Sequence, residues 1–232
     1  MYPDQIVEKP EIPKSGRTTS EEANLEKEIY YTDGYFSHGQ FISFAEQMRL
    51  VHSLNRKDIL EIGIGNGVVS AFLRKAGLNV TTFDINPNLS PDVVGSVTDL
   101  MDIFQHRKFD LILCAEVLEH MPFEDFEQAI SNIAGTTNEY AILILPRCQK
   151  VIFDIQFSIK IPKLPYIEKG LFLSMPNSNI TPEHHWELDS SKETKLKEID
   201  TILKKHFTIL DSGRFRFRSC HHYFILKKHT AN

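Results

Sequence analysis

The chain has 232 residues, 41% of them hydrophobic and 25% charged, and its 26 Lys+Arg against 31 Asp+Glu give a formal net charge of -5. This composition excludes a disordered or collagen-like chain, and the length suits one sizeable domain. The acidic balance argues against bulk packaging of nucleic acid. We therefore expect a globular protein with a substantial core.

The cysteine pattern and the lack of a long apolar segment indicate the cellular compartment. Cys114, Cys148 and Cys220 are too widely spaced for a zinc knuckle and odd in number for a closed disulfide set, which favours a reducing compartment. No apolar run approaches the roughly 20 residues of a spanning helix, and the first residues lack a basic and then apolar leader. These features predict a soluble, cytoplasmic protein without a membrane span, and they say nothing of its oligomeric state.

The N-terminal part divides into an arm and a helical cap. Residues 1–18 carry prolines among charges without periodicity, which is typical of a flexible arm. The domain is expected over residues 19–232 and begins with a helical cap over residues 19–55. Thr19 with Glu22 and Ser37 with Gln40 match capping boxes and predict two helix starts. The second helix has an apolar stripe expected to face the core, made of Phe41, Phe44, Met48 and Val51.

The central part alternates short apolar runs with helical stretches. Helices are expected at Val68–Ala76 and Pro122–Ala134, each followed by a glycine, Gly77 or Gly135, that ends it. This alternation predicts an α/β fold with a doubly wound, mostly parallel sheet. The predicted strands are Asp58–Ile62, Asn79–Phe83, Val93–Val97, Phe109–Ala115 and Glu139–Leu145.

The C-terminal part contains an insertion and a predicted hairpin. Residues 151–183 form the insertion, in which Phe153 to Ile161 alternate apolar and polar residues like a strand. A lid over a substrate pocket, a dimer contact and an edge strand all remain open for it. A helix is expected at Lys192–Lys205, opened by Ser190 and Glu193. The strands predicted after it, Phe207–Leu210 and His222–Lys227, would form an antiparallel hairpin at the sheet edge.

A glycine-rich turn follows the first predicted strand. The segment ILEIGIGNGVV has glycines at positions 63, 65 and 67. A strand that leads through such a turn into a helix brings backbone amides close to a ligand. The Gly-x-Gly-x-Gly spacing is one residue tighter than the Gly-x-Gly-x-x-Gly of dinucleotide folds. By itself the turn indicates only close approach of a ligand to the backbone.

Two further segments narrow the ligand class. Asp84 ends the next strand about twenty residues on, where a carboxylate can bind ribose hydroxyls, although it could instead cap the turn before Asn86-Pro87. The segment FDLILCAEVLEHMP then brings two carboxylates and an imidazole to the carboxyl edge of the sheet, where α/β proteins bind ligands. Together the turn and the acid predict an adenosine-type ligand.

These three segments, in this order, resemble the class I S-adenosylmethionine-dependent methyltransferases. The resemblance is close over residues 57–145 and concerns only the layout elsewhere. It implies a seven-stranded sheet with a reversed C-terminal hairpin, and S-adenosylmethionine as cofactor across the strand ends. The residues it implies for the cofactor are Glu61, Gly63, Ile64, Gly65, Asn66 and Gly67 at the methionine moiety, Asp84 at the ribose, Ile85 on the adenine, Ser96, Val97 and Thr98 at the adenine edge, and Cys114 and Ala115 beside the sulfonium. Ser96 departs from the Asp of many relatives.

The glycine motif leaves the methyl acceptor open, because transfer from a sulfonium needs mainly an aligned and deprotonated acceptor. His184 and His185, in TPEHHWEL, are candidate bases, with Glu116 and His120 framing the pocket. Hydrogen-bonded loop residues are the alternative for both histidines. The His-His-Trp-Glu run is similar to stretches in bacterial methyltransferases of glycans and small metabolites, which favours a small-molecule or glycan hydroxyl, or an amine. The Phe153–Ile161 strand would then form a pocket wall, or its apolar side would pack in the core.

The E-x-x-E-H turn allows a metal-dependent alternative. Glu116, Glu119 and His120 resemble the metal motif of small-RNA 3′-terminal 2′-O-methyltransferases and, more loosely, of ubiquinone-pathway O-methyltransferases. His185 would complete a set of two carboxylates and two imidazoles suited to Mg²⁺, Mn²⁺ or Zn²⁺. Members of the superfamily without a metal share E-V-L-E-H, so a metal-independent enzyme is the main expectation and an RNA 2′-O-methyltransferase the alternative.

Near the C-terminal end, Arg214, Arg216 and Arg218 alternate with phenylalanines. On one strand the three arginines would share a face, either as a clamp for an anion or as a solvated edge.

Two other function classes are open. A non-catalytic S-adenosylmethionine-binding module is a further possibility, against which the intact glycine turn and Asp84 argue. A nucleotide-dependent enzyme of the dinucleotide fold fits the tighter glycine spacing poorly.

Overall fold

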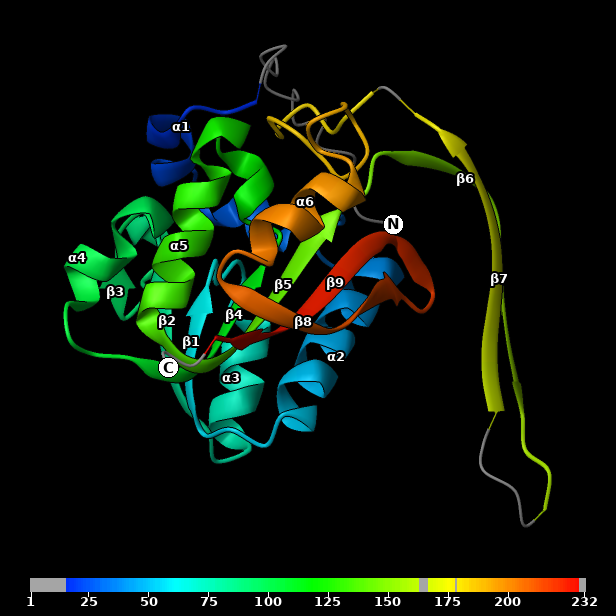
Figure 1. Cartoon of the computed structure of the whole chain (residues 1–232), viewed down its shortest axis with the longest axis horizontal. Helices are drawn as coiled ribbons and strands as arrows, with labels where there is room; N and C mark the ends of the chain where they lie inside the picture. The colour runs from blue at the N-terminus through cyan, green and yellow to red at the C-terminus, as the bar shows by residue number, and fades with distance from the viewer. Residues whose placement is uncertain (1–15, 163–166, 178, 230–232) are drawn as a thin grey trace, which may run out of the picture.

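A sheet with helices on both faces forms the body of the protein (Figure 1). The computed structural model describes residues 16–162, 167–177 and 179–229. The seven strands lie in the order β3-β2-β1-β4-β5-β9-β8. These strands are β1 (Asp58–Ile62), β2 (Asn79–Asp84), β3 (Val93–Val94), β4 (Phe109–Ala115), β5 (Thr137–Pro146), β8 (Phe207–Phe215) and β9 (Arg218–Lys228). The α-helices are α1 (Thr19–Ala23), α2 (His38–Ser53), α3 (Val68–Lys75), α4 (Leu100–Phe104), α5 (Phe126–Thr136) and α6 (Leu196–Leu203).

The strand pairing confirms the predicted doubly wound sheet. The first five strands pair in parallel, as in the register Ile59↔Val80 between β1 and β2. Strand β9 then pairs antiparallel with both β5 and β8, so the predicted C-terminal hairpin is present at this end of the sheet. The carboxyl ends of β1, β2 and β4 consequently lie side by side, which is where ligands bind in such sheets.

Alternate residues of the strands supply two cores, one on each face of the sheet. Ile59 of β1 packs in the cluster formed with α2 and α3, whereas Leu60 packs in the cluster formed with α4, α5 and α6. Strands that are buried on both faces need continuous apolar runs, and the sequence of β4 has such a run. In α2, Phe44 and Val51 are buried as predicted, but Phe41 is 48% exposed.

Several predicted helix ends were wrong by one or more residues. The first capping box is formed by Thr18 with Glu21, one residue earlier than predicted. Gly135 does not end a helix but lies inside α5. A Cβ atom at this position would lie 2.3 Å from the Met101 sulfur, so the glycine allows α4 to pack closely against α5. Helix α6 begins only at Leu196, because Ser191 and Thr194 bond each other in the preceding turn.

The predicted arginine stripe was also wrong. Strand β8 ends at Phe215 and β9 begins at Arg218, so the segment between them is a turn and the three arginines do not share one strand face. Phe217 has a positive φ of 58° and is 61% exposed, which is typical of a turn. Strand β3 likewise covers only Val93–Val94, since Ser96 caps the short helical turn that follows.

The insertion forms a second sheet of two antiparallel strands, β6 (Gln149–Ile159) and β7 (Ile167–Pro176). We call this pair the β-ribbon. Figure 1 shows it projecting from the body as a long arm. Residues 1–15 of the predicted N-terminal arm, and 163–166 and 178 of the insertion, lie outside the described residues.

Among the described helices, none combines the length and the apolar character needed to cross a membrane.

The packing of Phe126 gives a test of the core. Its ring is fully buried, stacks on Phe123 and meets the edge of Trp186 at 5.1 Å between centroids. We expect Phe126→Ala to lower the free energy of unfolding by about 3–5 kcal/mol, because the substitution leaves a large cavity. Phe72→Ala, at a side chain that is 57% exposed, should change it by less than about 1 kcal/mol. Urea unfolding followed by circular dichroism measures both, and equal effects would contradict this view of the core.

Candidate functional site

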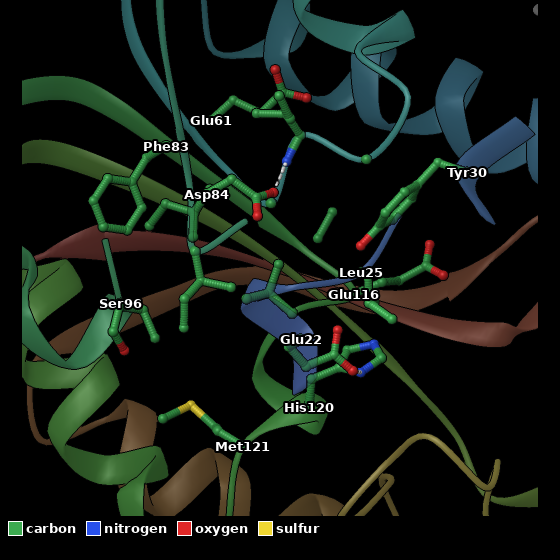
Figure 2. Close-up of a pocket in the computed structure, with 18 of the residues that line it drawn as sticks. Glu22, Leu25, Tyr30, Glu61, Phe83, Asp84, Ser96, Glu116, His120 and Met121 are labelled. Atoms are coloured by element: carbon green, nitrogen blue, oxygen red, sulfur yellow. Dashed lines mark hydrogen bonds and ion pairs between the residues drawn. The ribbon is translucent and has the colours of Figure 1, made fainter. Parts of the chain in front are cut away.

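A pocket lies at the carboxyl ends of β1, β2 and β4, and the N-terminal segment forms one of its walls (Figure 2). Of the residues predicted for a cofactor, most line this pocket. These are Glu61, Gly63, Ile64, Gly65, Asn66, Asp84, Ile85, Ser96, Val97, Thr98 and Ala115. Gly67 and Cys114 are not among the lining residues. The three motifs that lie apart in the sequence therefore meet in one cavity.

The glycine turn needs its glycines for backbone conformation and for space. Gly63 has a φ of +80°, and a Cβ atom there would lie 2.2 Å from Cγ2 of Val117. Gly67 has a φ of +74° and directly precedes α3, so its role is to form the turn and start the helix rather than to line the pocket. The turn thus leaves backbone of residues 63–66 at the pocket surface.

Asp84 holds the glycine turn from the neighbouring strand. One oxygen of its carboxylate accepts a hydrogen bond from the backbone N–H of Ile64 at 2.9 Å (Figure 2). The other accepts one from the backbone N–H of Asn86 at 2.9 Å. Burial raises the pKa of this carboxyl, although both hydrogen bonds oppose the rise. Asp84 therefore caps the following turn, as one interpretation held, and also lines the pocket.

Glu61 is a buried acid without full hydrogen bonding. It lies at the end of β1, is 3% exposed, and its Oε2 atom has no hydrogen-bond partner among the described residues. Burial raises the pKa of Glu61 to about 8, and a hydrogen bond with Ser70 only partly offsets this. A buried carboxyl of this kind is suited to pair with a cationic group of a ligand.

The segment after β3 forms another part of the wall. Ser96 accepts a hydrogen bond from the backbone N–H of Thr98, and the Asn132 side chain on α5 donates to the carbonyl oxygen of Val97 at 3.1 Å and to that of Thr98. These bonds fix a polar rim on the side of the pocket where Phe83 and Ser96 are seen in Figure 2.

The end of β4 brings charged groups to the pocket, but it does not bring the Cys114 side chain there. Cys114 is 1% exposed in the main core, because alternate residues of the strand point to opposite faces, and burial raises the pKa of its thiol. Glu116 lines the pocket with a positive φ of 56°. Its carboxylate accepts a hydrogen bond from Ser43 at 3.0 Å and lies 3.2 Å from Nδ1 of His221.

His120 and Glu22 form a pair at the pocket wall. Nδ1 of His120 lies 3.1 Å from Oε1 of Glu22, which comes from α1 (Figure 2). Burial disfavours the charged imidazole, but the hydrogen bond with Glu22 and the charges of Glu119 and Glu22 outweigh it and raise the pKa of His120. Both side chains line the pocket, so a proton-accepting group lies next to the predicted cofactor site.

His184 and His185 do not line this pocket. Nδ1 of His184 lies 2.8 Å from Glu187, while its ring meets that of His120 at 4.8 Å between centroids. The Nε2 atom of His185 lies 2.8 Å from the backbone oxygen of Arg17. The alternative interpretation, in which both histidines are hydrogen-bonded loop residues, agrees with these contacts.

The four predicted metal ligands do not come together. Glu116 faces His221, and His185 bonds the N-terminal segment, so neither joins Glu119 and His120. Potential ligand atoms of Glu119, His120 and His184 do lie within 4.8 Å of one another. Both Glu119 oxygens are buried without a hydrogen-bond partner among the described residues, and burial raises the pKa of this carboxyl to about 7.

The N-terminal cap supplies lining residues that sequence reasoning missed. They come from the segment before and within the cap, and their signal in the sequence was only that aromatic and charged residues are dense there. Tyr30 and Tyr35 lie with ring centroids 5.2 Å apart, and burial raises the pKa of both. The missed lining residues include Arg17, Glu22, Leu25, Tyr30, Tyr35 and Gln40.

The comparisons with known proteins agree with this geometry. Residues 39–146 match a family model described as a methyltransferase domain. Residues 39–146 are therefore similar to a methyltransferase domain. The methyltransferase fold is similar to that of N-methyltransferase NodS from Bradyrhizobium japonicum WM9, solved with S-adenosylhomocysteine, at 14% identity and a TM-score of 0.55 over 91% of this chain and 97% of that one. The fold of magnesium protoporphyrin IX methyltransferase from Synechocystis PCC 6803, solved with S-adenosylmethionine, gives 18% identity and a TM-score of 0.52 over 83% and 80%.

Curated relatives of this methyltransferase domain match over a shorter region. A ubiquinone biosynthesis O-methyltransferase from Hydrogenovibrio crunogenus is 33% identical over 35% of this chain and 38% of its own length. The enzyme of the same name from Rickettsia typhi is 25% identical over 43% of this chain and 45% of its own length. The chain thus spans less than half of the length of these relatives.

Glu61 gives a pH test of the cofactor pocket. The resemblance places it at the methionine moiety, whose ammonium group pairs best with an ionised carboxylate. Because the pKa of Glu61 is raised to about 8, its charge is lost as pH falls below that value. We expect S-adenosylhomocysteine to bind more tightly as pH rises toward about 8, by roughly tenfold for one charged hydrogen bond.

Calorimetric titration across this range measures the effect. Glu61→Gln should bind weakly and with a flatter pH dependence, whereas Glu46→Gln, outside the pocket lining, should behave like the wild type. A wild-type affinity that falls as pH rises would contradict the role of Glu61.

Proposed function

We propose that the protein transfers the methyl group of S-adenosylmethionine to a hydroxyl group of a small molecule. The observation that carries this proposal is the Glu22–His120 pair in the same pocket as the glycine turn and Asp84. The curated relatives named ubiquinone biosynthesis O-methyltransferases support oxygen as the methylated atom. A glycan hydroxyl and an amine are further acceptors of this type.

The cofactor fits the residues that line the pocket. Glu61 offers an unpaired buried oxygen for an ammonium group, and the turn at Gly63 to Asn66 leaves backbone without side-chain cover. Asp84 lines the pocket near the turn it holds and would meet the ribose. When bound, S-adenosylmethionine supplies an electrophilic methyl group on a sulfonium centre.

His120 has the geometry of a general base. Its Nδ1 atom faces a carboxylate oxygen of Glu22, so in the neutral imidazole the proton lies on Nδ1 and Nε2 is left free to accept one. Glu22 orients the ring and stabilises the imidazolium that forms when the acceptor hydroxyl gives up its proton. In this proposal His120 replaces His184 and His185 as the base, and His184 supports its ring from the side.

The first experiment tests the cofactor directly. Calorimetry with S-adenosylmethionine and S-adenosylhomocysteine, repeated with EDTA and with added Mg²⁺, should give binding that does not depend on the metal. The absence of binding would overturn the proposed function. Binding that requires the metal would favour the alternative of a metal-dependent RNA 2′-O-methyltransferase, and binding without transfer to any acceptor would favour the non-catalytic module.

His120→Gln should lower turnover by about 10²–10⁴-fold, the range of general base catalysis, while S-adenosylhomocysteine affinity stays within a few-fold. A panel of phenols and catechols, with release of S-adenosylhomocysteine as the readout, measures this. Glu22→Gln should cause a smaller loss, because His120 remains. His52→Gln is the matched control, since this histidine is exposed at the end of α2. A His120 variant that loses affinity and turnover equally would instead assign the residue to cofactor binding.

A further inference from the structure

The β-ribbon has one apolar face and one polar face. Directly paired residues of antiparallel strands point to the same side. The pairs Ile155↔Leu171 and Phe153↔Leu173 therefore share a face. The next two pairs on this face, toward the tip of the ribbon, are Phe157↔Lys169 and then Ile159↔Ile167. The opposite face carries Asp154, Gln156 and Ser158 on β6 and Gly170 and Phe172 on β7.

The apolar face is exposed along its length. Ile155 is 54% exposed and Leu171 is 60% exposed, although they lie at the centre of the face. Their neighbours on the face are also exposed, namely Phe153 (38%), Phe157 (48%), Ile159 (47%), Ile167 (38%) and Leu173 (48%). Contiguous apolar surface of this kind marks an interaction site in proteins.

The root of the β-ribbon turns its polar face to the body. The guanidinium carbon of Arg214, on β8, lies 4.3 Å from the ring centroid of Phe172, which belongs to the polar face. The Gln149 side chain also donates a hydrogen bond to the backbone oxygen of Ser219 at 3.2 Å. The apolar face consequently points away from the body, and none of the described ribbon residues lines the cofactor pocket.

The charges around the apolar face favour an anionic partner. Lys169 lies within that face, Lys150 lies on β6 and Lys160 directly follows β6, against the acids Asp154 and Glu168. Arg214 and Arg218 lie instead on the side of the polar face and of the body, where Arg218 bonds His221 and Gln40. The described ribbon residues thus carry three lysines against two acids, although the whole chain has a net charge of -5.

A second copy of the chain fits this surface poorly. A ribbon of 11 residues is about 36 Å long and two strands are about 10 Å wide, so two such faces would bury only about 700 Å² together, less than a stable interface needs. The Lys169 ammonium would also lie at the buried face. At a lipid surface, by contrast, a lysine can extend its apolar stem along the acyl boundary and keep its charge at the phosphates.

We propose that the apolar face of the β-ribbon docks on an anionic lipid surface. The side chains of Phe153, Ile155, Phe157, Leu171 and Leu173 enter the boundary between headgroups and acyl chains, while the Lys169 ammonium faces the lipid phosphates. The ribbon lies in this interfacial layer rather than across the membrane, because its open strand edges need water or headgroups for their backbone hydrogen bonds.

Vesicle co-sedimentation tests the proposal. The full-length protein is mixed with vesicles of phosphatidylcholine alone, or of phosphatidylcholine with an equal part of phosphatidylglycerol. We expect binding to the anionic vesicles at least tenfold tighter than to the neutral ones, since each basic residue near the surface contributes about 1 kcal/mol. The double variant Ile155→Asp/Leu171→Asp should lose at least tenfold of the anionic binding.

The matched control is Gln156→Asp/Ser158→Asp, which adds the same two charges on the polar face and should keep more of the binding. S-adenosylhomocysteine affinity and the unfolding temperature should stay unchanged in both variants, which separates this test from the proposed function. Equal loss in the two variants, or no wild-type binding, would overturn the proposal. Sedimentation velocity without lipid would overturn it as well if the wild type dimerises and Ile155→Asp/Leu171→Asp does not.

Discussion

The hydrogen bonds of the Asp84 carboxylate hold the site together. One oxygen fixes the glycine turn through the Ile64 N–H, and the other fixes the N–H of Asn86. The Asn86 side chain in turn donates to the backbone oxygen of Leu25 at 2.8 Å, which fastens the N-terminal segment that brings Glu22 to His120. A single buried acid thus links the cofactor side of the pocket to the side with the proposed base.

Buried acids are the chief electrostatic feature of the pocket region. Burial raises the pKa of Glu61 to about 8 and that of Glu119 to about 7, and both carboxyls have oxygens without a partner among the described residues. Leaving such groups unpaired costs folding free energy, on the order of 1–3 kcal/mol for each polar group. For Glu61, which lines the pocket, a cationic group of the proposed cofactor would complete the hydrogen bond and offset this cost. Glu119 does not line the pocket and lies beside His120 and His184 instead.

The sheet and the cofactor side of the pocket could be predicted from the sequence, because local patterns determine them. Apolar runs specified β1 and β4, and the glycine spacing specified the turn at Gly63. The proposed acid–base pair could not be predicted, since Glu22 and His120 are 98 residues apart and meet only through the folding of the cap. The opposite case is His185. The histidine-rich run TPEHHWEL predicts a catalytic base there, but the His185 ring is hydrogen-bonded to the backbone oxygen of Arg17 and does not line the pocket.

The β-ribbon has the apolar pattern of a core strand, but its apolar residues lie at the surface of the protein. Alternation of apolar and polar residues normally indicates a strand with one face in the core, and the Phe153–Ile161 pattern was interpreted in that way or as a pocket wall. The strand is present, but nothing in the described residues covers Ile155 or Leu171. Two-stranded ribbons are only marginally stable alone, so the proposed lipid surface would add to the stabilisation that the root gains from its contacts with the body. In that proposal the alternation of apolar and polar residues serves an interface instead of the core.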